Sequence, residues 1–288
     1  MLQHLAGLAQ AGTPPAASFE LSALIPRWQA SLRDTWRSWV CTQTKQTLQQ
    51  VQQGAPLSQL GGQSNAMSLR SAAAYGYYAT EDDAVRFARL AMFTHREQTA
   101  HAGAEFFTRV AFRVLHADPG GSLTPRQAME EVAALPSTSA FVRTKVAQGL
   151  AKADEAMNPE SALSREAFAD DLALTSMARL WDVGKTEPIK VGKASPTEGT
   201  LPGAVYFITK YEGNFEGAAQ ANAEVGGDTA SRAVAIGMVM GAAQGLEGIP
   251  EALGKGHLVE WEAAEALLDQ LPLIKIEQAS GSKIGEEF

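Results

Sequence analysis

The sequence has one cysteine and few basic side chains, and each scarcity excludes a class of protein. Cys41 stands alone, so an internal disulfide and a thiolate metal cluster are both excluded. A lone thiol favours a reducing compartment, and we expect a cytoplasmic protein. Lysine and arginine number 24 against 32 Asp and Glu, a net charge of −8. This balance disfavours a nucleic-acid-binding protein, because no basic field would attract phosphates.

Long apolar runs are also missing. No segment reaches the roughly 18 apolar residues that cross a bilayer, so we expect no membrane association. Residues 1–20 lack a basic start followed by a long apolar core, which argues against a secretory signal. Apolar residues still make up 45% of the 288, enough for a substantial core. The oligomeric state is left open by the sequence.

The hydrophobic periodicity predicts an all-α protein with roughly ten helices and no alternating strand. An apolar stripe of Leu24, Trp28, Leu32, Trp36 and Val40 predicts a helix that begins near Ser22 and has a polar continuation to Gln53. Tryptophans at 28, 36 and 39 suggest that this helix is well buried. Thr80 before three acids, and Thr124 before a proline, are typical of helix starts.

No stretch between residues 55 and 270 is long enough to link two separate cores. We therefore expect a single large helical domain over residues 21–272. Residues 1–20, which include Gly12-Thr13-Pro14-Pro15, are expected to be a flexible arm. Residues 273–288 are expected to be a flexible tail.

The most informative stretch is Gly226-Gly227-Asp228 and the run of small residues that follows it to Gly245. Two glycines permit a sharp turn and close approach to another group. Asp228 then has two interpretations, which can both hold: it caps the helix, or it is a hard oxygen ligand for a divalent cation. Glycines at 237, 241 and 245 line one helix face, where we expect another backbone to pack closely.

Four segments occur in an order that resembles the ADP-ribosylglycohydrolase family, over about residues 55–255. They are Ser64-Asn65-Ala66-Met67-Ser68-Leu69-Arg70, Thr94-His95, Leu201-Pro202-Gly203-Ala204-Val205-Tyr206, and Gly226-Gly227-Asp228-Thr229 with its small-residue helix. The resemblance implies an all-helical fold and a two-magnesium site.

By the same resemblance, Ser64, Asn65 and His95 approach ADP-ribose or the ADP-ribose of a modified substrate. Gly226 and Gly227 are assigned to the same ligand site, and Asp228 and Ser231 to the metal. The residues alone leave simpler alternatives open. Ser64 and Asn65 also suit a turn before a helix, and His95 also suits a helix C-terminus, where the dipole favours it.

The departures from the family pattern concern the metal. Ala230 stands where the family's last motif has its second acid. The family's Thr-Asp-Asp-Thr and Gly-Asp-Ala motifs have no counterpart before residue 61, so we expect an incomplete magnesium site and possible shortening at the N-terminus. Ala66 replaces a glycine of the family's loop, and its methyl group could block a close approach to the ligand. The altered metal motif is similar to that of a branch with eye-lens crystallins and a related selenoprotein.

Two functions follow from the resemblance, and the sequence does not decide whether the chain is an enzyme. The first is hydrolysis of the glycosidic bond of ADP-ribosylated substrates, at a weak or impaired rate. The second is a non-catalytic protein that binds ADP-ribose or serves a structural, crystallin-like role. Ala230 and the missing motifs favour the second function, whereas Asp228, Ser64, Asn65 and His95 favour the first, or at least binding.

Overall fold

The computed structural model describes residues 1–35, 39–117, 123–180, 186–187, 189–190 and 192–280. Within these ranges the chain forms thirteen α-helices and one pair of short antiparallel strands. The helices are α1 (Leu2–Gln10), α2 (Leu21–Ala30), α3 (Thr42–Gln52), α4 (Glu81–Ala91), α5 (Gln98–Leu115), α6 (Pro125–Ala134), α7 (Ala140–Met157), α8 (Ala169–Met177), α9 (Thr197–Lys210), α10 (Phe215–Glu224), α11 (Thr229–Gln244), α12 (Trp261–Leu268) and α13 (Pro272–Ser280); the strands are β1 (Arg179–Leu180) and β2 (Ile189–Lys190). The predicted all-α class is confirmed.

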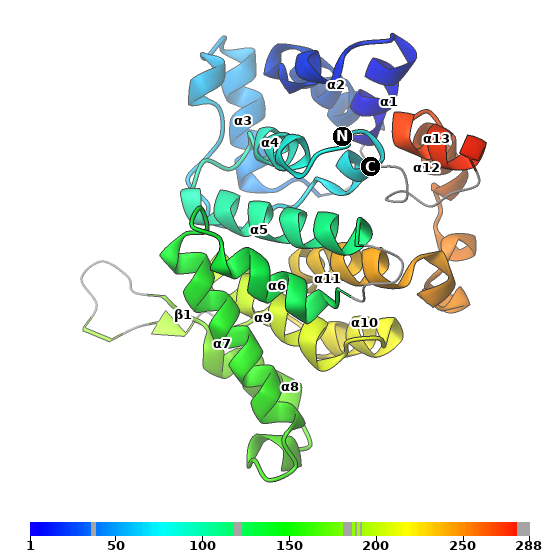
Figure 1. The fold of residues 1–288 in the computed structure, drawn as a ribbon. Coiled ribbons are helices and arrows are strands. Elements are labelled where there is room, and N and C mark those ends of the chain that lie inside the picture. The colour runs from blue at the N-terminus through cyan, green and yellow to red at the C-terminus, as the bar shows by residue number, and fades with distance from the viewer. Residues whose placement is uncertain (36–38, 118–122, 181–185, 188, 191, 281–288) are drawn as a thin grey trace.

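Helix α5 crosses the middle of the molecule, with α1 to α4 on one side and α6 to α11 on the other (Figure 1). It contacts α4 on the first side and α6 and α11 on the second, while α7 packs along α9. Two apolar clusters consequently meet at α5. Phe107 and Val110 belong to the larger cluster, and Phe112 belongs to the smaller one, next to α4.

Side-chain caps begin several helices where the sequence predicts them. The Thr80 hydroxyl accepts a hydrogen bond from the Asp83 amide at 3.3 Å, at the start of α4. Thr124 and Gln127 form a reciprocal capping box at the start of α6, with Pro125 in the first turn. Both predicted helix starts are confirmed.

Helix α1 lies in the segment for which the sequence predicts a flexible arm. Leu5 and Ala6 are buried in the smaller cluster together with Tyr78 and Phe87. Leucines at 2, 5 and 8 recur at helical spacing, and the Gly-Thr-Pro-Pro segment ends this helix rather than marking a loose region. The division of the chain at residues 20 and 272 stays a prediction.

The C-terminal part of the described chain is also helical. Helix α13 occupies residues 272–280, where the sequence predicts the start of a flexible tail, and its Leu273 is buried. Residues 281–288 lie outside the described residues. No helix in the described ranges is long and apolar enough to span a membrane.

The predicted tryptophan-rich helix is shorter than expected. Helix α2 ends at Ala30, a π-turn covers Ser31–Thr35, and Trp39 is 78% exposed. Trp28 does pack, edge-on to Phe93 at 5.0 Å between ring centroids, whereas Trp36 lies outside the described residues. A four-residue repeat drifts by about 40° per step around an α-helix. The stripe therefore cannot keep facing one core.

The glycine face of α11 does not pack as predicted. A methyl group built on Gly237 or Gly241 would meet no atom within 4 Å. The buried positions of this helix are instead Ala235, Ile236, Val239 and Met240, with Arg232 near its start. Larger apolar side chains supply the contacts with α5 and α9. The prediction of close backbone packing on the glycine face is therefore wrong for the described part of the chain.

Candidate ligand-binding site

The Ser64–Asn65 loop is tied to the start of α9. The Asn65 carbonyl accepts a hydrogen bond from the Thr197 amide at 3.0 Å, and the Asn65 Nδ2 donates to Glu198 Oε2 at 2.7 Å. The Ser64 hydroxyl accepts from the Ala66 amide at 3.2 Å, which is the bond expected of a turn. Ser64, Asn65 and Glu198 are all half-buried, so a ligand could reach them.

His95 lies beside this loop. The Gly62 amide donates to the Thr94 carbonyl at 3.1 Å, and the Arg96 amide donates to the Gly62 carbonyl at 2.8 Å. These two bonds form a parallel bridge between Gly62 and His95. The segment that leads into Ser64 is thus fixed against the segment that carries His95, and the structure brings these two predicted parts of the site together.

The His95 ring is held in its neutral form. Arg70 Nη1 donates to the Thr94 hydroxyl oxygen at 2.9 Å, which leaves the hydroxyl proton free to donate to His95 Nδ1, also at 2.9 Å. Burial first, and then the nearby charge of Arg70, lower the pKa of His95 to about 4. At neutral pH this imidazole therefore carries no charge and is a hydrogen-bonding group.

The Gly226–Asp228 turn is built around the backbone of Lys193. Both glycines have left-handed backbones, with φ of 68° and 72°. The Asp228 amide donates to the Lys193 carbonyl at 2.7 Å, and a methyl group on Gly227 would lie 2.3 Å from that carbonyl oxygen. Glycine is required at 227 for both reasons.

Asp228 caps α11, as one of its two interpretations predicts. Its Oδ1 accepts from the Ser231 amide at 3.0 Å, and its Oδ2 accepts from the Ser231 hydroxyl at 2.8 Å. Both carboxylate oxygens therefore already take part in the helix start. The two residues assigned to a metal are each other's hydrogen-bond partners.

Arg232 is the residue of this turn that the sequence analysis missed. Its side chain is fully buried, and it donates to Asn222 Oδ1 at 2.8 Å, to the Gly226 carbonyl at 2.7 Å and to the Lys193 carbonyl at 3.3 Å. Burial lowers the pKa of this guanidinium to about 10, against the attraction of Asp228. The sequence does mark Arg232, because it is the one charged residue in the run of small and apolar residues from 230 to 245.

The arginine stem also needs space, and a glycine supplies it. A methyl group on Gly203 would come within 3.0 Å of the Arg232 Cδ. Gly203 belongs to the segment that resembles the family's motif before the last turn. Two of the motifs found in the sequence therefore meet at this buried guanidinium.

The segment from 193 to 198 joins the two halves of the site. Its Lys193 carbonyl bonds to the Gly226–Arg232 turn, and its Thr197 and Glu198 bond to Asn65. Glu198, like Arg232, was not identified from the sequence, because its partner lies 133 residues away. The site consequently consists of four segments, around residues 62–65, 94–96, 193–198 and 226–232, that are cross-linked by backbone hydrogen bonds.

The donor set does not suit a two-magnesium centre. Among the described residues, no group of three or more His, Cys, Asp or Glu side chains is arranged to hold a metal ion. Magnesium prefers six oxygen ligands, and carboxylates supply the charge. Asp228 and Ser231 have three side-chain oxygens between them, and all three already take part in hydrogen bonds within the turn.

The model of the ADP-ribosylglycohydrolase family matches residues 1–281. The chain belongs to the ADP-ribosylglycohydrolase family. The match extends well beyond residues 55–255, where the motifs are recognised, and it includes all of α1 and α13. No curated protein matches the chain.

Proposed function

We propose that this family member binds ADP-ribose, or the ADP-ribose unit of a modified substrate, and hydrolyses the glycosidic bond weakly if at all. The binding site would comprise Ser64, Asn65 and His95 together with Gly226 and Gly227. Family membership supports the ligand class. The half-buried side chains of Ser64 and Asn65 would meet the hydroxyl groups of the ligand.

One observation carries the proposal of weak hydrolysis. The turn that bears magnesium ligands in the family pattern is held here by a buried guanidinium. Arg232 donates hydrogen bonds to the carbonyls of Gly226 and Lys193. Both carboxylate oxygens of Asp228 accept hydrogen bonds from Ser231. A fixed positive charge beside Asp228 opposes the entry of a dication into the same turn.

Residual hydrolysis would depend on the remaining acid of the site. Glu198 is the carboxylate bonded to Asn65, and it would position a water molecule against the anomeric carbon. His95 would not serve as a general acid at neutral pH, because its pKa of about 4 leaves it unprotonated. A carboxylate without electrophilic help for the ribose gives only part of the usual rate enhancement.

Calorimetric titration of ADP-ribose in magnesium and in EDTA tests the proposal. We expect equal affinity in both buffers, and about tenfold weaker binding in Asn65→Ala, which removes a hydrogen bond to the ligand. Asn158→Ala, at the far end of α7, is the matched control and should bind normally. Binding that strengthens with magnesium and is lost in Asp228→Ala would instead establish a working metal site.

A second candidate is the structural, crystallin-like role. It is favoured by the way the site's polar groups already bond to one another: Thr94 to His95, Asn65 to Glu198 and Asp228 to Ser231. Such a protein would keep the helical fold without a ligand. The absence of any ADP-ribose binding in either buffer would favour this role and contradict the first proposal.

A further inference from the structure

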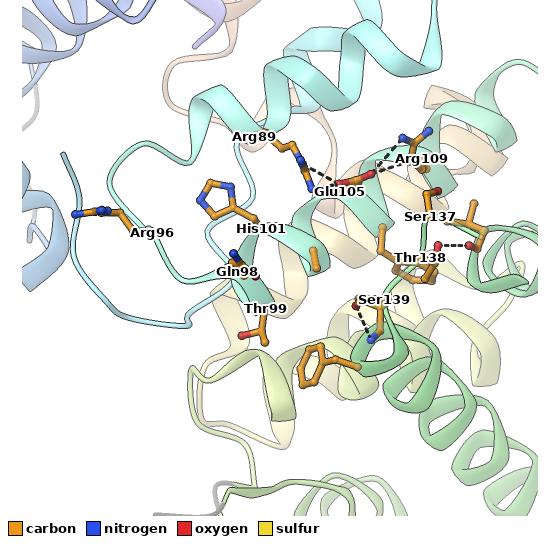
Figure 2. A pocket seen from close by; sticks show the side chains of 15 residues that line it. Arg89, Arg96, Gln98, Thr99, His101, Glu105, Arg109, Ser137, Thr138 and Ser139 are labelled. Carbon is orange, nitrogen blue, oxygen red and sulfur yellow. Dashed lines mark hydrogen bonds and ion pairs between the residues drawn. The ribbon is translucent and has the colours of Figure 1, made fainter. Parts of the chain in front are cut away.

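A separate cleft of about 590 Å³ lies between the end of α4, the first half of α5 and the turn from α6 to α7. Arg96 stands at one end of it, and Ser137 and Ser139 lie toward the other (Figure 2). None of the residues assigned to the ADP-ribose site lines this cleft. His101 is the nearest link, since its Nε2 donates to the His95 carbonyl at 2.5 Å.

The walls of the cleft carry more positive than negative charge. Three arginines line it, at 89, 96 and 109, against a single carboxylate, Glu105. Arg89 contacts Glu105 at 2.8 Å and Arg109 contacts it at 3.1 Å, so two guanidiniums share this one carboxylate (Figure 2). Arg109 is further balanced by Glu81 outside the cleft.

Arg96 is the cation that remains available. Its side chain is exposed and makes one hydrogen bond, from Nη1 to the Gln59 carbonyl at 3.3 Å. The side chain has no ion pair among the described residues. Its backbone is nevertheless fixed by the bond to Gly62, and its Cγ would lie 2.9 Å from a methyl group on Gly61. The Arg96 backbone is thus fixed beside the cleft, while its guanidinium is directed toward the Gln59 carbonyl (Figure 2). Only that one 3.3 Å hydrogen bond would have to break for the side chain to turn toward the cleft.

The opposite end of the cleft carries Ser137, Thr138 and Ser139 beside the paired charges of Arg109 and Glu105 (Figure 2). Ser139 caps α7 through the Val142 amide at 3.2 Å, and the Thr138 hydroxyl donates to the Val132 carbonyl at 2.6 Å. Phe141 is half-buried and lines the same wall. An aromatic ring in this position offers a face against which a planar apolar group can stack.

We propose that this cleft binds a small phosphate-bearing molecule of mononucleotide size. The exposed Arg96 side chain would turn from the Gln59 carbonyl to pair with the phosphate, because a guanidinium matches phosphate oxygens with parallel hydrogen bonds. The planar body of the ligand would lie toward Phe141. The volume falls within the usual range for small-molecule pockets, about 300–1,000 Å³. The proposal does not depend on the ADP-ribose site, since it rests on other residues.

Calorimetric titration with AMP, adenosine and inorganic phosphate tests the cleft. We expect AMP to bind at least about tenfold more tightly than adenosine, because the charge-assisted bonds to phosphate are the strong ones. Raising the salt concentration should weaken AMP binding and leave adenosine binding unchanged. Equal affinities for AMP and adenosine, or no AMP binding at millimolar concentration, would overturn the proposal.

Variants then locate the binding. Arg96→Ala should weaken AMP about tenfold or more, and it should fold normally because this side chain is exposed. Phe141→Ala should weaken AMP but not inorganic phosphate. The control is Arg165→Ala, an exposed arginine on the distant loop before α8, which should bind AMP as the wild type does. An unchanged affinity for AMP in Arg96→Ala would contradict the assignment.

The two binding sites can be separated in one set of measurements. Asn65→Ala should weaken ADP-ribose and leave AMP titration unchanged, whereas Arg96→Ala should affect AMP. A loss of AMP binding in Asn65→Ala would mean that AMP enters the ADP-ribose site instead, and the cleft proposal would fail while the other stood.

Discussion

Arg232 and Arg96 illustrate two opposite uses of the same side chain. Arg232 is fully buried and donates three hydrogen bonds to Asn222, Gly226 and Lys193. Arg96 is exposed and makes one long bond to a carbonyl. A guanidinium whose donors are all used inside the protein stabilises the fold, and one whose donors are free is available to a ligand. The Arg232 guanidinium therefore stabilises the turn of the family's last motif, whereas the Arg96 guanidinium, beside the cleft along α5, keeps most of its donors free.

The largest expected effect is at Arg232. Arg232→Met removes the guanidinium and leaves the Gly226 carbonyl and the buried Asn222 Oδ1 without this donor, whereas the Lys193 carbonyl keeps the Asp228 amide. We therefore expect a loss of about 3–4 kcal/mol in the free energy of unfolding. Urea denaturation measures it. Arg96→Ala is the contrast and should change stability by less than about 0.5 kcal/mol. Similar losses of unfolding free energy in Arg232→Met and Arg96→Ala would contradict the different roles assigned to the two arginines.

Gly227 tests the backbone of the same turn that Arg232 bonds to. Gly227→Ala places a methyl group against the Lys193 carbonyl and forces alanine into a left-handed backbone with φ of 72°, which should cost about 2–3 kcal/mol. Gly213 has a φ of 80° but no atom within 4 Å of the added methyl group. Gly213→Ala should therefore cost only about 1 kcal/mol. If both variants lose the same amount, the contact with Lys193 does not contribute.

His95 predicts a pH dependence of stability. Its pKa is about 4 in the folded protein and about 6.5 when unfolded, so between these values the unfolded state binds the additional proton. Above pH 6.5 the neutral His95 contributes fully to the free energy of unfolding, and this contribution is lost as the pH falls toward 4. We expect His95→Gln to remove about 2 kcal/mol of the difference between the unfolding free energies at pH 7 and pH 4.5.

The comparison must be made between the variant and the wild type. Burial also lowers the pKa of His4, and this group changes stability in the same direction. Equal pH profiles for the wild type and His95→Gln would show that His95 does not titrate in this window. The Thr94–Arg70 contacts would then have to be compatible with a charged ring.

Sequence reasoning succeeded where the interaction is local. Thr80 and Asp228 were identified as helix caps because each bonds to an amide three residues ahead, a spacing visible in one segment. Glu198 was missed because its partner lies 133 residues away. Arg232 was missed because its partners lie 6, 10 and 39 residues before it, at no spacing that a helix or a cap would predict. The family's motifs indicated which segments meet. They did not reveal that an internal arginine bonds within the turn assigned to a metal.

The smallest expected effect concerns the glycine face of α11, where the sequence predicts close packing. Because a methyl group on Gly237 meets nothing within 4 Å, Gly237→Ala should not clash, and alanine favours the helix over glycine by up to about 1 kcal/mol. We therefore expect a small gain in stability, measured by urea denaturation, in contrast to the large loss at Gly227. A loss of stability in Gly237→Ala would mean that another chain or segment packs on this face in solution, and a change in oligomeric state on substitution would identify a second copy as that partner.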